Sequence, residues 1–342
     1  MFLARKFCKT RNLLFLCALL ICFMLIYLSR NWTPYYPSPV KRSKPPKSSE
    51  PPYVPISFNA TFSNVSYKYH LLTKPRPDLC HNKSFFAYIV TRPSSFEMRQ
   101  AIRSTWAHPD NWTHASFFFA MGDPRNVEIS KKLEAENEDY GDLIITDLVD
   151  SYKNLTLKVY AGLDWFNRFC SEVQFFMKID DDVALHVERL VHFVNTKFQR
   201  SPNQTVYCAF GDVVVIRNNS SKWYVPPELY APSTYPNFCI GATYMISAEA
   251  AKVIGEKTPE HPFLYIDDVF YTGIVAEAAG IPRVNEAQIF FNWDAIKDVT
   301  CDEGGVPYLA TMYEFKTPEA LFKAYYTLQG IKCGPWWRAL LG

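Results

Sequence analysis

A strand-like run that ends in three adjacent carboxylates is the feature that most constrains the fold of this chain. Residues 173–179 are apolar and aromatic apart from Gln174 and Lys178, as expected of a buried strand, and residues 180–182 are all aspartates. Three adjacent carboxylates repel one another, so they need a cation or a dense set of hydrogen-bond donors among them. Oxygen ligands suit Mg²⁺, Mn²⁺ or Ca²⁺, and the first two commonly bridge to the diphosphate of a substrate. An acidic turn or a helix N-cap is the alternative interpretation.

The sequence around this run alternates between strand and helix patterns. Strands are predicted at residues 85–90, 117–120, 143–145 and 205–210, helices at residues 96–106, 127–137, 155–166 and 187–198, and a strand with two helices within residues 241–280. The alternation predicts an α/β fold in which helices flank a mostly parallel sheet. The sequence has no G-x-G-x-x-G after the first strand and no Walker, G-x-S-x-G or H-E-x-x-H motif. Dinucleotide-binding, P-loop, serine hydrolase and zinc protease classes are therefore not supported.

The first 30 residues are typical of a signal-anchor. Basic residues precede an uncharged apolar stretch at 13–28, which Ser29 and Arg30 close. A cleaved signal peptide is the alternative, but the run is long for one and no small-residue cleavage site follows it. Positive charge before a span keeps that side in the cytosol. We therefore expect a cytoplasmic tail at residues 1–12, a transmembrane helix at 13–29 and a lumenal remainder, which is a single-pass type II topology in a thin, early secretory membrane.

A stem is predicted between this anchor and the folded part of the chain. Residues 30–79 are rich in Pro, Ser, Lys and Tyr and show no periodicity. This composition is typical of a semi-extended, disordered segment that packs against nothing. The folded domain is accordingly expected at residues 80–342, and a fragment that begins near Leu79 is expected to fold.

The remainder of the sequence agrees with a lumenal location. N-x-[ST] sequons begin at Asn31, Asn59, Asn64, Asn82, Asn111, Asn154, Asn203, Asn218 and Asn219. The cysteines after the apolar run are Cys80, Cys170, Cys208, Cys239, Cys301 and Cys333. Their even number in an oxidising compartment allows up to three disulfides. The balance of 36 Lys and Arg against 34 Asp and Glu does not support nucleic acid binding.

A second acidic pair, Asp267 and Asp268, follows the apolar residues 262–266. A helix N-cap is one interpretation. A carboxylate beside a hydrophobic wall also suits a general base, because burial raises its pKa toward neutrality. One acidic cluster that binds a metal and a second that accepts a proton would together suit the transfer of a sugar from a nucleotide diphosphate. The metal would stabilise the leaving diphosphate, and the base would deprotonate an acceptor hydroxyl.

Five segments in order resemble the β-1,3-galactosyltransferase and β-1,3-N-acetylglucosaminyltransferase family, glycosyltransferase family 31, across roughly residues 85 to 333. The segments are residues 98–106, 150–158, 178–183, 235–241 with Tyr244, and 266–269 with Thr272 and Gly273. The resemblance implies a GT-A-like fold, with residues 80–342 as the catalytic domain, an inverting mechanism, Mn²⁺ and a Golgi membrane location. It implies a UDP-sugar donor carrying galactose, N-acetylglucosamine or N-acetylgalactosamine, and a glycan acceptor on a glycoprotein or glycolipid.

The resemblance also implies roles for individual residues. It makes Asp268 the catalytic base with Asp267 as its neighbour, and it makes Asp180 and Asp182 the pair that faces the ribose and the metal. The residues expected to bind the nucleotide are Arg99, Arg103, Lys158, Asp180 and Asp181. For the first three, ordinary charge on a helix surface is the alternative.

The chain departs from the family pattern at two places. Where relatives follow the aspartates with Val, an aromatic residue, Val and Asn, this chain has Val183, Ala, Leu and His186. His186 could approach the metal, but a solvated loop histidine is the favoured interpretation. Relatives also carry a histidine four residues before a proline near the C-terminus, which completes the metal site. Glu314 stands four residues before Pro318 here, and a glutamate can bind Mn²⁺ in that place.

Two other classes of protein remain as alternatives. The chain could be a membrane-anchored glycan-binding protein that keeps a glycosyltransferase scaffold without turnover. It could also be a lumenal glycosidase, whose paired carboxylates need no metal.

Overall fold

The computed structural model describes residues 53–200, 204–290 and 300–334. These residues all lie within the unit Ser38–Gly342. The predicted cytoplasmic tail, the predicted transmembrane helix and the first part of the predicted stem lie outside the described residues. Within the described ranges, no helix is both long and apolar enough to span a bilayer.

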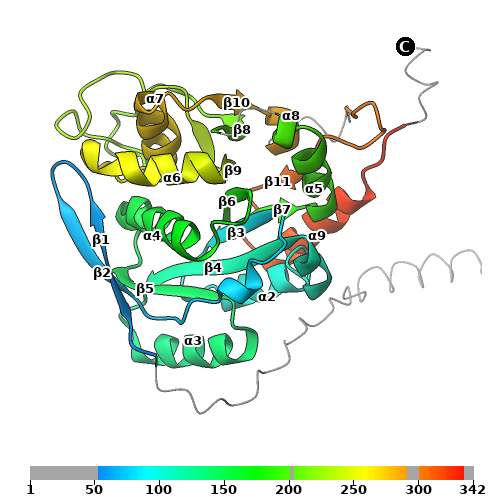
Figure 1. Ribbon diagram of the computed structural model, residues 1–342, viewed down its shortest axis with the longest axis horizontal. Coiled ribbons are helices and arrows are strands. Elements are labelled where there is room, and N and C mark those ends of the chain that lie inside the picture. The colour runs from blue at the N-terminus through cyan, green and yellow to red at the C-terminus, as the bar shows by residue number, and fades with distance from the viewer. Residues whose placement is uncertain (1–52, 201–203, 291–299, 335–342) are drawn as a thin grey trace, which may run out of the picture. The chain divides into compact units, whose positions relative to one another are not determined.

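A nine-stranded sheet forms the centre of the described part of the chain (Figure 1). Its strands, in spatial order, are β1 (Ile56–Thr61), β2 (Ser66–Leu71), β5 (Leu143–Val149), β4 (Ala115–Asp123), β3 (Phe85–Val90), β6 (Phe175–Asp180), β9 (Cys239–Ser247), β8 (Val206–Phe210) and β10 (Arg283–Asn285). The central strands β5, β4, β3 and β6 are parallel, whereas β9 runs antiparallel to β6 and β8. The predicted α/β fold with a mostly parallel central sheet is confirmed.

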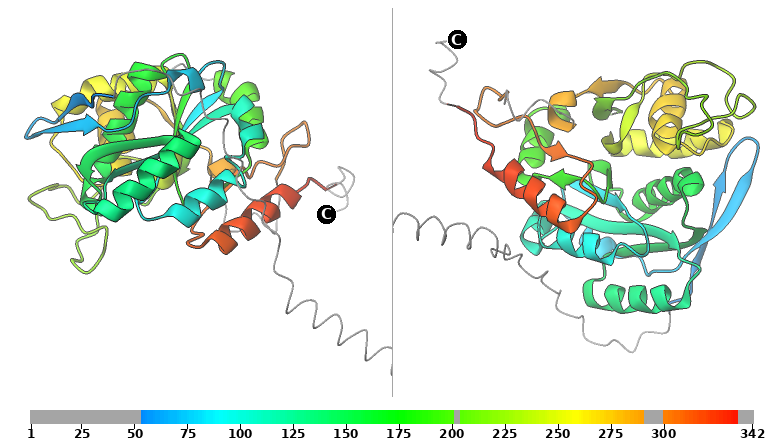
Figure 2. Two further views of the ribbon diagram at one scale, coloured as in Figure 1. Left: turned by 90° about the horizontal axis from the view of Figure 1, so that it is seen from below. Right: turned by 180° about the vertical axis from the view of Figure 1, so that it is seen from behind.

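The predicted helices form close to their expected positions. They are α2 (Phe96–Arg103), α3 (Val127–Tyr140), α4 (Leu155–Phe169), α5 (Val187–Thr196) and α6 (Ala248–Lys257), followed later in the chain by α7 (Ala276–Ala278), α8 (Ala287–Phe290) and α9 (Pro318–Gly330). The second helix expected within residues 241–280 is a π-helix, Val269–Val275, which continues into α7. A separate two-stranded sheet pairs β7 (Ala184–Leu185) with β11 (Thr311–Met312), and α9 packs beside α2 (Figure 2).

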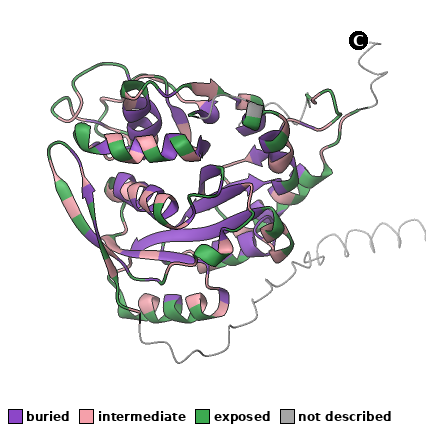
Figure 3. Cartoon of the chain, in the orientation of Figure 1, coloured by how far each residue is buried: buried purple, intermediate pink, exposed green. Residues whose placement is uncertain are grey.

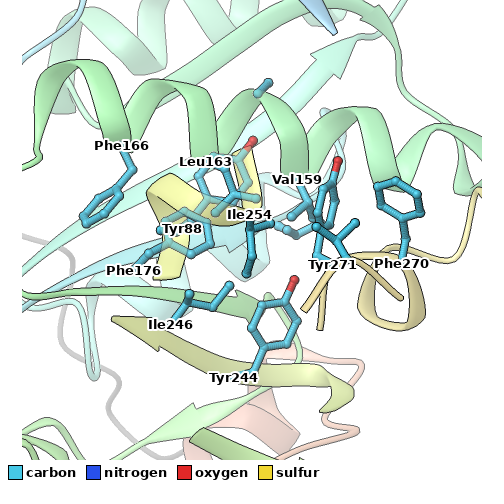
Figure 4. Close-up of a cluster of buried hydrophobic side chains, with 14 of the residues drawn as sticks. Tyr88, Val159, Leu163, Phe166, Phe176, Tyr244, Ile246, Ile254, Phe270 and Tyr271 are labelled. Atoms are coloured by element: carbon cyan, nitrogen blue, oxygen red, sulfur yellow. The ribbon is translucent and has the colours of Figure 1, made fainter. Parts of the chain in front are cut away.

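Side chains alternate between the two faces of the sheet along β3, and one of these faces packs on α4. Tyr88 points toward α4 (Figure 4). Phe86 lies on the same face of β3 and stacks on Trp165 of α4 at 5.1 Å between ring centroids. The Tyr88 hydroxyl donates to the Lys158 carbonyl at 2.6 Å. Gly162 allows this contact, because a Cβ at that position would lie 2.6 Å from the Tyr88 ring. Phe85 lies on the opposite face, where its ring packs on the Phe117 ring. The central strands are accordingly buried (Figure 3).

The predicted disordered stem is wrong for residues 56–71, which form a β-hairpin of strands β1 and β2. Apolar side chains alternate along both strands, and Phe58, Phe62, Tyr69 and Leu71 are buried in the main hydrophobic core. Period-two alternation of this kind gives a strand one face to bury, which the proline-rich residues before it lack. The domain boundary expected at residue 80 therefore lies too far along the chain.

The three disulfides allowed by the cysteine count are formed. They join Cys80 to Cys170, Cys208 to Cys239, and Cys301 to Cys333. The first ties the chain before β3 to the end of α4, and the second joins β8 to the start of β9. Among the sequons in the described residues, the asparagines at 59, 64, 82, 218 and 219 are exposed, which leaves them accessible for glycosylation.

Candidate active site

The carboxyl ends of the parallel strands meet at one edge of the sheet. The backbone N–H of Asp181, just after β6, donates to the Val90 carbonyl at the end of β3 at 3.1 Å. The N–H of Asp150, just after β5, donates to the Asp123 carbonyl at the end of β4 at 3.4 Å. The loops that follow β3, β4, β5 and β6 are thereby brought together, at the edge where open α/β sheets bind their ligands.

Asp180 is the last residue of β6, and Lys178 lies on the same face of that strand. The Lys178 Nζ is 2.6 Å from the Asp180 Oδ1 and also donates to the Gly241 carbonyl. Lys178 is only 3% exposed. Burial raises the pKa of Asp180 to about 7, and the Lys178 charge opposes this shift. Lys178 was not predicted as a site residue, although a lysine inside an otherwise apolar strand is a signal that could have identified it.

Asp181 and Asp182 point to different partners. The Asp181 Oδ2 accepts a hydrogen bond from the Thr91 hydroxyl at 2.6 Å. Burial raises the pKa of the half-buried Asp182, and the nearby carboxylates of Asp181 and Glu314 raise it further. The Phe315 N–H donates to the Asp182 carbonyl at 3.0 Å, which holds the exposed Glu314 beside the aspartates. Glu314 has a left-handed φ of 76°, a conformation that costs a non-glycine residue energy.

The oxygen donors at this edge match the preference of Mg²⁺ and Mn²⁺, but they do not form a closed cage. In the described ranges, no three His, Cys, Asp or Glu side chains converge closely enough to hold a metal ion. A divalent ion bound by one or two carboxylates together with substrate phosphates needs no such cage. The metal roles of Asp180, Asp182 and Glu314 stay predictions.

The favoured interpretation of His186 as a solvated loop residue is wrong. His186 is the buried N-cap of α5, and its Nδ1 accepts from the Arg189 N–H at 3.4 Å. Burial lowers the pKa of His186 to about 4, so the imidazole is neutral at physiological pH. The His186 N–H also donates to the Ala310 carbonyl at 2.8 Å, which ties the start of α5 to the residue before β11.

Arg99 and Arg103 lie in a buried ion network on α2. Arg99 is 0% exposed and makes paired contacts to Glu136 at 2.8 and 2.7 Å. Arg103 makes paired contacts to Asp142 at 2.8 and 2.7 Å and reaches Glu136 at 2.7 Å. Arg99 also donates to the carbonyls of the loop after β3. These contacts favour a structural role over the expected contact with a nucleotide, because every guanidinium nitrogen already has a protein acceptor.

Lys158 connects three of the strand ends. Its Nζ is 2.6 Å from the Asp150 Oδ2 and 3.2 Å from the Thr91 carbonyl oxygen. The same Asp150 oxygen accepts the Gly122 N–H at 2.8 Å. Gly122 is required here, because a Cβ would lie 2.2 Å from the Leu148 carbonyl oxygen. Lys158 thus lies at the predicted edge, where it holds the loops after β3, β4 and β5 together.

The second acidic pair lies at the start of the π-helix, and its two members differ in exposure. Asp268 is half-buried and is the N-cap, with its Oδ1 accepting the Val269 N–H at 2.8 Å. Asp267 is 5% exposed, and its Oδ2 has no hydrogen-bond partner among the described residues. Burial raises the pKa of Asp268 to about 7, and the Asp267 charge adds to this while the Lys178 charge opposes it. Of the two, Asp268 is the more exposed.

Gly241 and Lys178 connect the two acidic groups, which are far apart in the sequence. The Gly241 carbonyl accepts the Lys178 ammonium, and a Cβ on Gly241 would lie 2.6 Å from the Asp268 Oδ2. The Lys178 charge acts on both Asp180 and Asp268. Burial, and then the Asp268 charge, raise the pKa of Tyr152. Tyr152 was not predicted as a site residue, although it lies within one of the segments that carry the family resemblance.

The buried Lys178 between two groups of carboxylates, at the edge where parallel strands end, marks this edge as the candidate active site of the α/β domain. The galactosyltransferase family profile matches residues 97–287. The chain belongs to the galactosyltransferase family and is a glycosyltransferase enzyme of the β-1,3 type. This membership favours transfer over the glycosidase and the non-catalytic alternatives.

Two relatives show the extent of the similarity. The chain is 31% identical over 237 residues to the beta-1,3-galactosyltransferase 1 of Homo sapiens. The aligned region covers 65% of this chain and 71% of the relative. It is also 31% identical over 270 residues to the lactosylceramide 1,3-N-acetyl-beta-D-glucosaminyltransferase of Homo sapiens. That aligned region covers 76% of this chain and 68% of the relative. The match to the family profile, over residues 97–287, includes both acidic groups of the site.

Proposed function

We propose that this chain is an inverting, GT-A-like hexosyltransferase that moves galactose from UDP-galactose to the 3-hydroxyl of a glycan acceptor. The observation that carries the proposal is the half-buried Asp268, with a pKa raised to about 7, joined through Gly241 and Lys178 to the aspartates at the end of β6. A carboxylate with a pKa near neutrality is suited to take a proton from a hydroxyl. The second group of carboxylates beside it is suited to hold a divalent cation for the leaving nucleotide diphosphate.

The direction of displacement supports separate roles for the two groups. In-line attack requires the nucleophile and the leaving UDP to lie on opposite sides of the anomeric carbon. In the proposed mechanism Asp268 takes the proton as the acceptor oxygen attacks, and an α-linked donor becomes a β-linked product. Lys178 holds Asp180 in place for the nucleotide side, since its ammonium is fixed by both Asp180 and the Gly241 carbonyl.

Mn²⁺ is the proposed cofactor, bound by Asp182 with Asp180 and Glu314 nearby. Crowded carboxylates with raised pKa values are a donor set that a cation would stabilise. When bound, a divalent ion would neutralise charge that develops on the leaving diphosphate.

The proposed location is the Golgi membrane, with a type II signal-anchor and the catalytic domain in the lumen. The apolar run at 13–28, the exposed sequons and the disulfides support this proposal, because disulfides persist in oxidising compartments. The proposed acceptor is a glycan on a glycoprotein or a glycolipid, in keeping with the glycolipid named for one of the relatives.

A donor and acceptor screen tests the proposed function. The purified full-length chain should transfer galactose from UDP-galactose faster than N-acetylglucosamine or N-acetylgalactosamine from their UDP forms. The product should carry a β-1,3 linkage by NMR. Release of free sugar with no acceptor product, or preference for another donor, would contradict the proposed reaction or donor respectively.

Asp182→Asn tests the metal site. The change keeps the side-chain volume but removes one charge, so we expect an unchanged melting temperature and a loss of Mn²⁺-dependent UDP binding by calorimetry. Glu314→Gln should weaken Mn²⁺ affinity more mildly, because Glu314 is exposed. If Asp182→Asn keeps wild-type Mn²⁺ and UDP binding, the metal assignment is wrong.

A further inference from the structure

The tip of the β1–β2 hairpin contacts the segment that leads into the second acidic pair. The Ser63 N–H donates to the His261 carbonyl at 2.9 Å, and the Asn64 Oδ1 accepts the Phe263 N–H at 2.9 Å. Residues 261–266 form neither helix nor strand, so their backbone polar groups need partners from elsewhere. The hairpin supplies two of them.

Ring packing reinforces these hydrogen bonds on both sides of the acidic pair. Phe62, which is 3% exposed, lies 5.1 Å from the Phe263 ring and 5.5 Å from the Phe270 ring between centroids. Phe263 precedes Asp267 and Asp268 in the chain, and Phe270 follows them. The Phe62 ring of the hairpin therefore packs on one ring that precedes the proposed base in the chain and on one ring that follows it.

Buried hydroxyl groups of α4 and the π-helix hold the same segment. The Thr156 hydroxyl on α4 donates to the Leu264 carbonyl at 2.6 Å. The Thr272 hydroxyl donates to the Asp268 carbonyl at 2.6 Å and accepts the Cys239 N–H at 2.9 Å. The hairpin therefore shares the support of this segment with α4 and the π-helix, and among the residues that the structure describes it alone contributes the bonds to the His261 carbonyl and the Phe263 N–H that are described above.

We propose that the β1–β2 hairpin positions the catalytic base, with Phe62 and Asn64 as positioning residues that act through residues 261–270. This inference rests on the proposed role of Asp268. It gives the hairpin a part in the reaction beyond its contribution to the core. A small displacement of Asp268 would slow proton transfer without changing how the nucleotide binds, because the nucleotide lies at the other acidic group.

Asn64 provides a sharp test, because three substitutions separate its hydrogen bond from its sequon. Asn64→Ala removes both the Oδ1 acceptor and the glycosylation site. Asn64→Asp keeps an acceptor oxygen and removes the site, and Ser66→Ala keeps Asn64 and removes the site. The full-length variants are compared for kcat, for KM of the donor and of the acceptor, and for melting temperature.

Asn64→Ala should lower kcat by about tenfold with the donor KM unchanged, whereas Asn64→Asp and Ser66→Ala should keep kcat within about twofold of wild type. The hairpin proposal would be overturned if all three variants kept the kcat of wild type. It would also be overturned if all three lost kcat to the same extent. Asp268→Asn, measured in parallel, reports on the base itself. If Asp268→Asn loses transfer while Asn64→Ala does not, Asp268 is still the base but the positioning role of the hairpin is wrong. If Asp268→Asn keeps transfer, the assignment of Asp268 as the base is itself wrong.

Discussion

Asp268→Asn is expected to lower the transfer rate by about 10²-fold or more while UDP and Mn²⁺ binding stay near wild type. The substituted amide keeps the size of the side chain and can still accept the Val269 N–H, so the N-cap of the π-helix is retained. It cannot take a proton from the acceptor hydroxyl. Single-turnover transfer and UDP binding by calorimetry would measure the two effects separately.

Asp267→Asn is the matched control, since the neighbouring carboxylate is buried and less accessible. Transfer that survives Asp268→Asn but fails in Asp267→Asn would exchange the two assignments. An α-linked product of the wild-type enzyme would contradict the inverting mechanism.

The pH dependence gives an independent check of the same base. A general base acts in its ionised form, and burial raises the pKa of Asp268 to about 7. The wild-type kcat/KM should therefore fall as the pH decreases below about 7, and this acidic limb should be absent from the remaining activity of Asp268→Asn. An acidic limb that is unchanged in the variant belongs to another group.

Removal of the β1–β2 hairpin is expected to prevent folding of the domain. Burial of a large apolar side chain contributes about 1.5–3 kcal/mol, so Phe58, Phe62, Tyr69 and Leu71 together contribute about 6–12 kcal/mol. This is comparable with the whole stability of a typical domain, about 5–15 kcal/mol. A secreted chain that begins at residue 80 should therefore aggregate or be retained in the cell, whereas one that begins at residue 53 should be secreted and folded.

Polar contacts of the hairpin add to this loss. The Tyr69 hydroxyl donates to Asp164 on α4 at 2.8 Å, and the His70 N–H donates to Asp147 on β5 at 2.6 Å. Without the hairpin, both carboxylates lose these donors and the outer edge of β5 is left open. Secretion yield and the melting temperature of the two fragments measure the outcome, and a folded fragment from residue 80 would show that the domain folds without the hairpin.

The local pattern of the sequence was sufficient for most of the central fold. The apolar runs at 85–90 and 143–145, and the helical spacing of Leu155, Val159 and Leu163, correspond to β3, β5 and α4. These patterns are informative because burial on a sheet or on one helix face imposes a period that the sequence itself must carry. The carboxylates at the end of β6 were found for the same reason, since they interrupt a buried strand where it leaves the sheet.

The hairpin shows where composition and periodicity disagree. Proline and serine are frequent from residue 30 onward, but alternation begins with Ile56 and continues through Leu71. Composition was averaged over a segment that contains two kinds of structure, so the alternating part was hidden. Periodicity measured in a window of strand length over residues 56–71 would have distinguished the two strands from the proline-rich residues before them.

What the sequence determined by itself was the class of fold, the two acidic groups and the family to which they belong. Only the tertiary structure decided which charges meet. Arg99 and Arg103 resemble surface charges on a helix, yet Glu136 and Asp142 bind them in the interior. Lys178 is joined to Asp180 and Gly241, and through them to Asp268. Local periodicity reports whether a side chain is buried, but a buried charge is stable only with a partner, and here that partner comes from distant parts of the chain that the fold brings together.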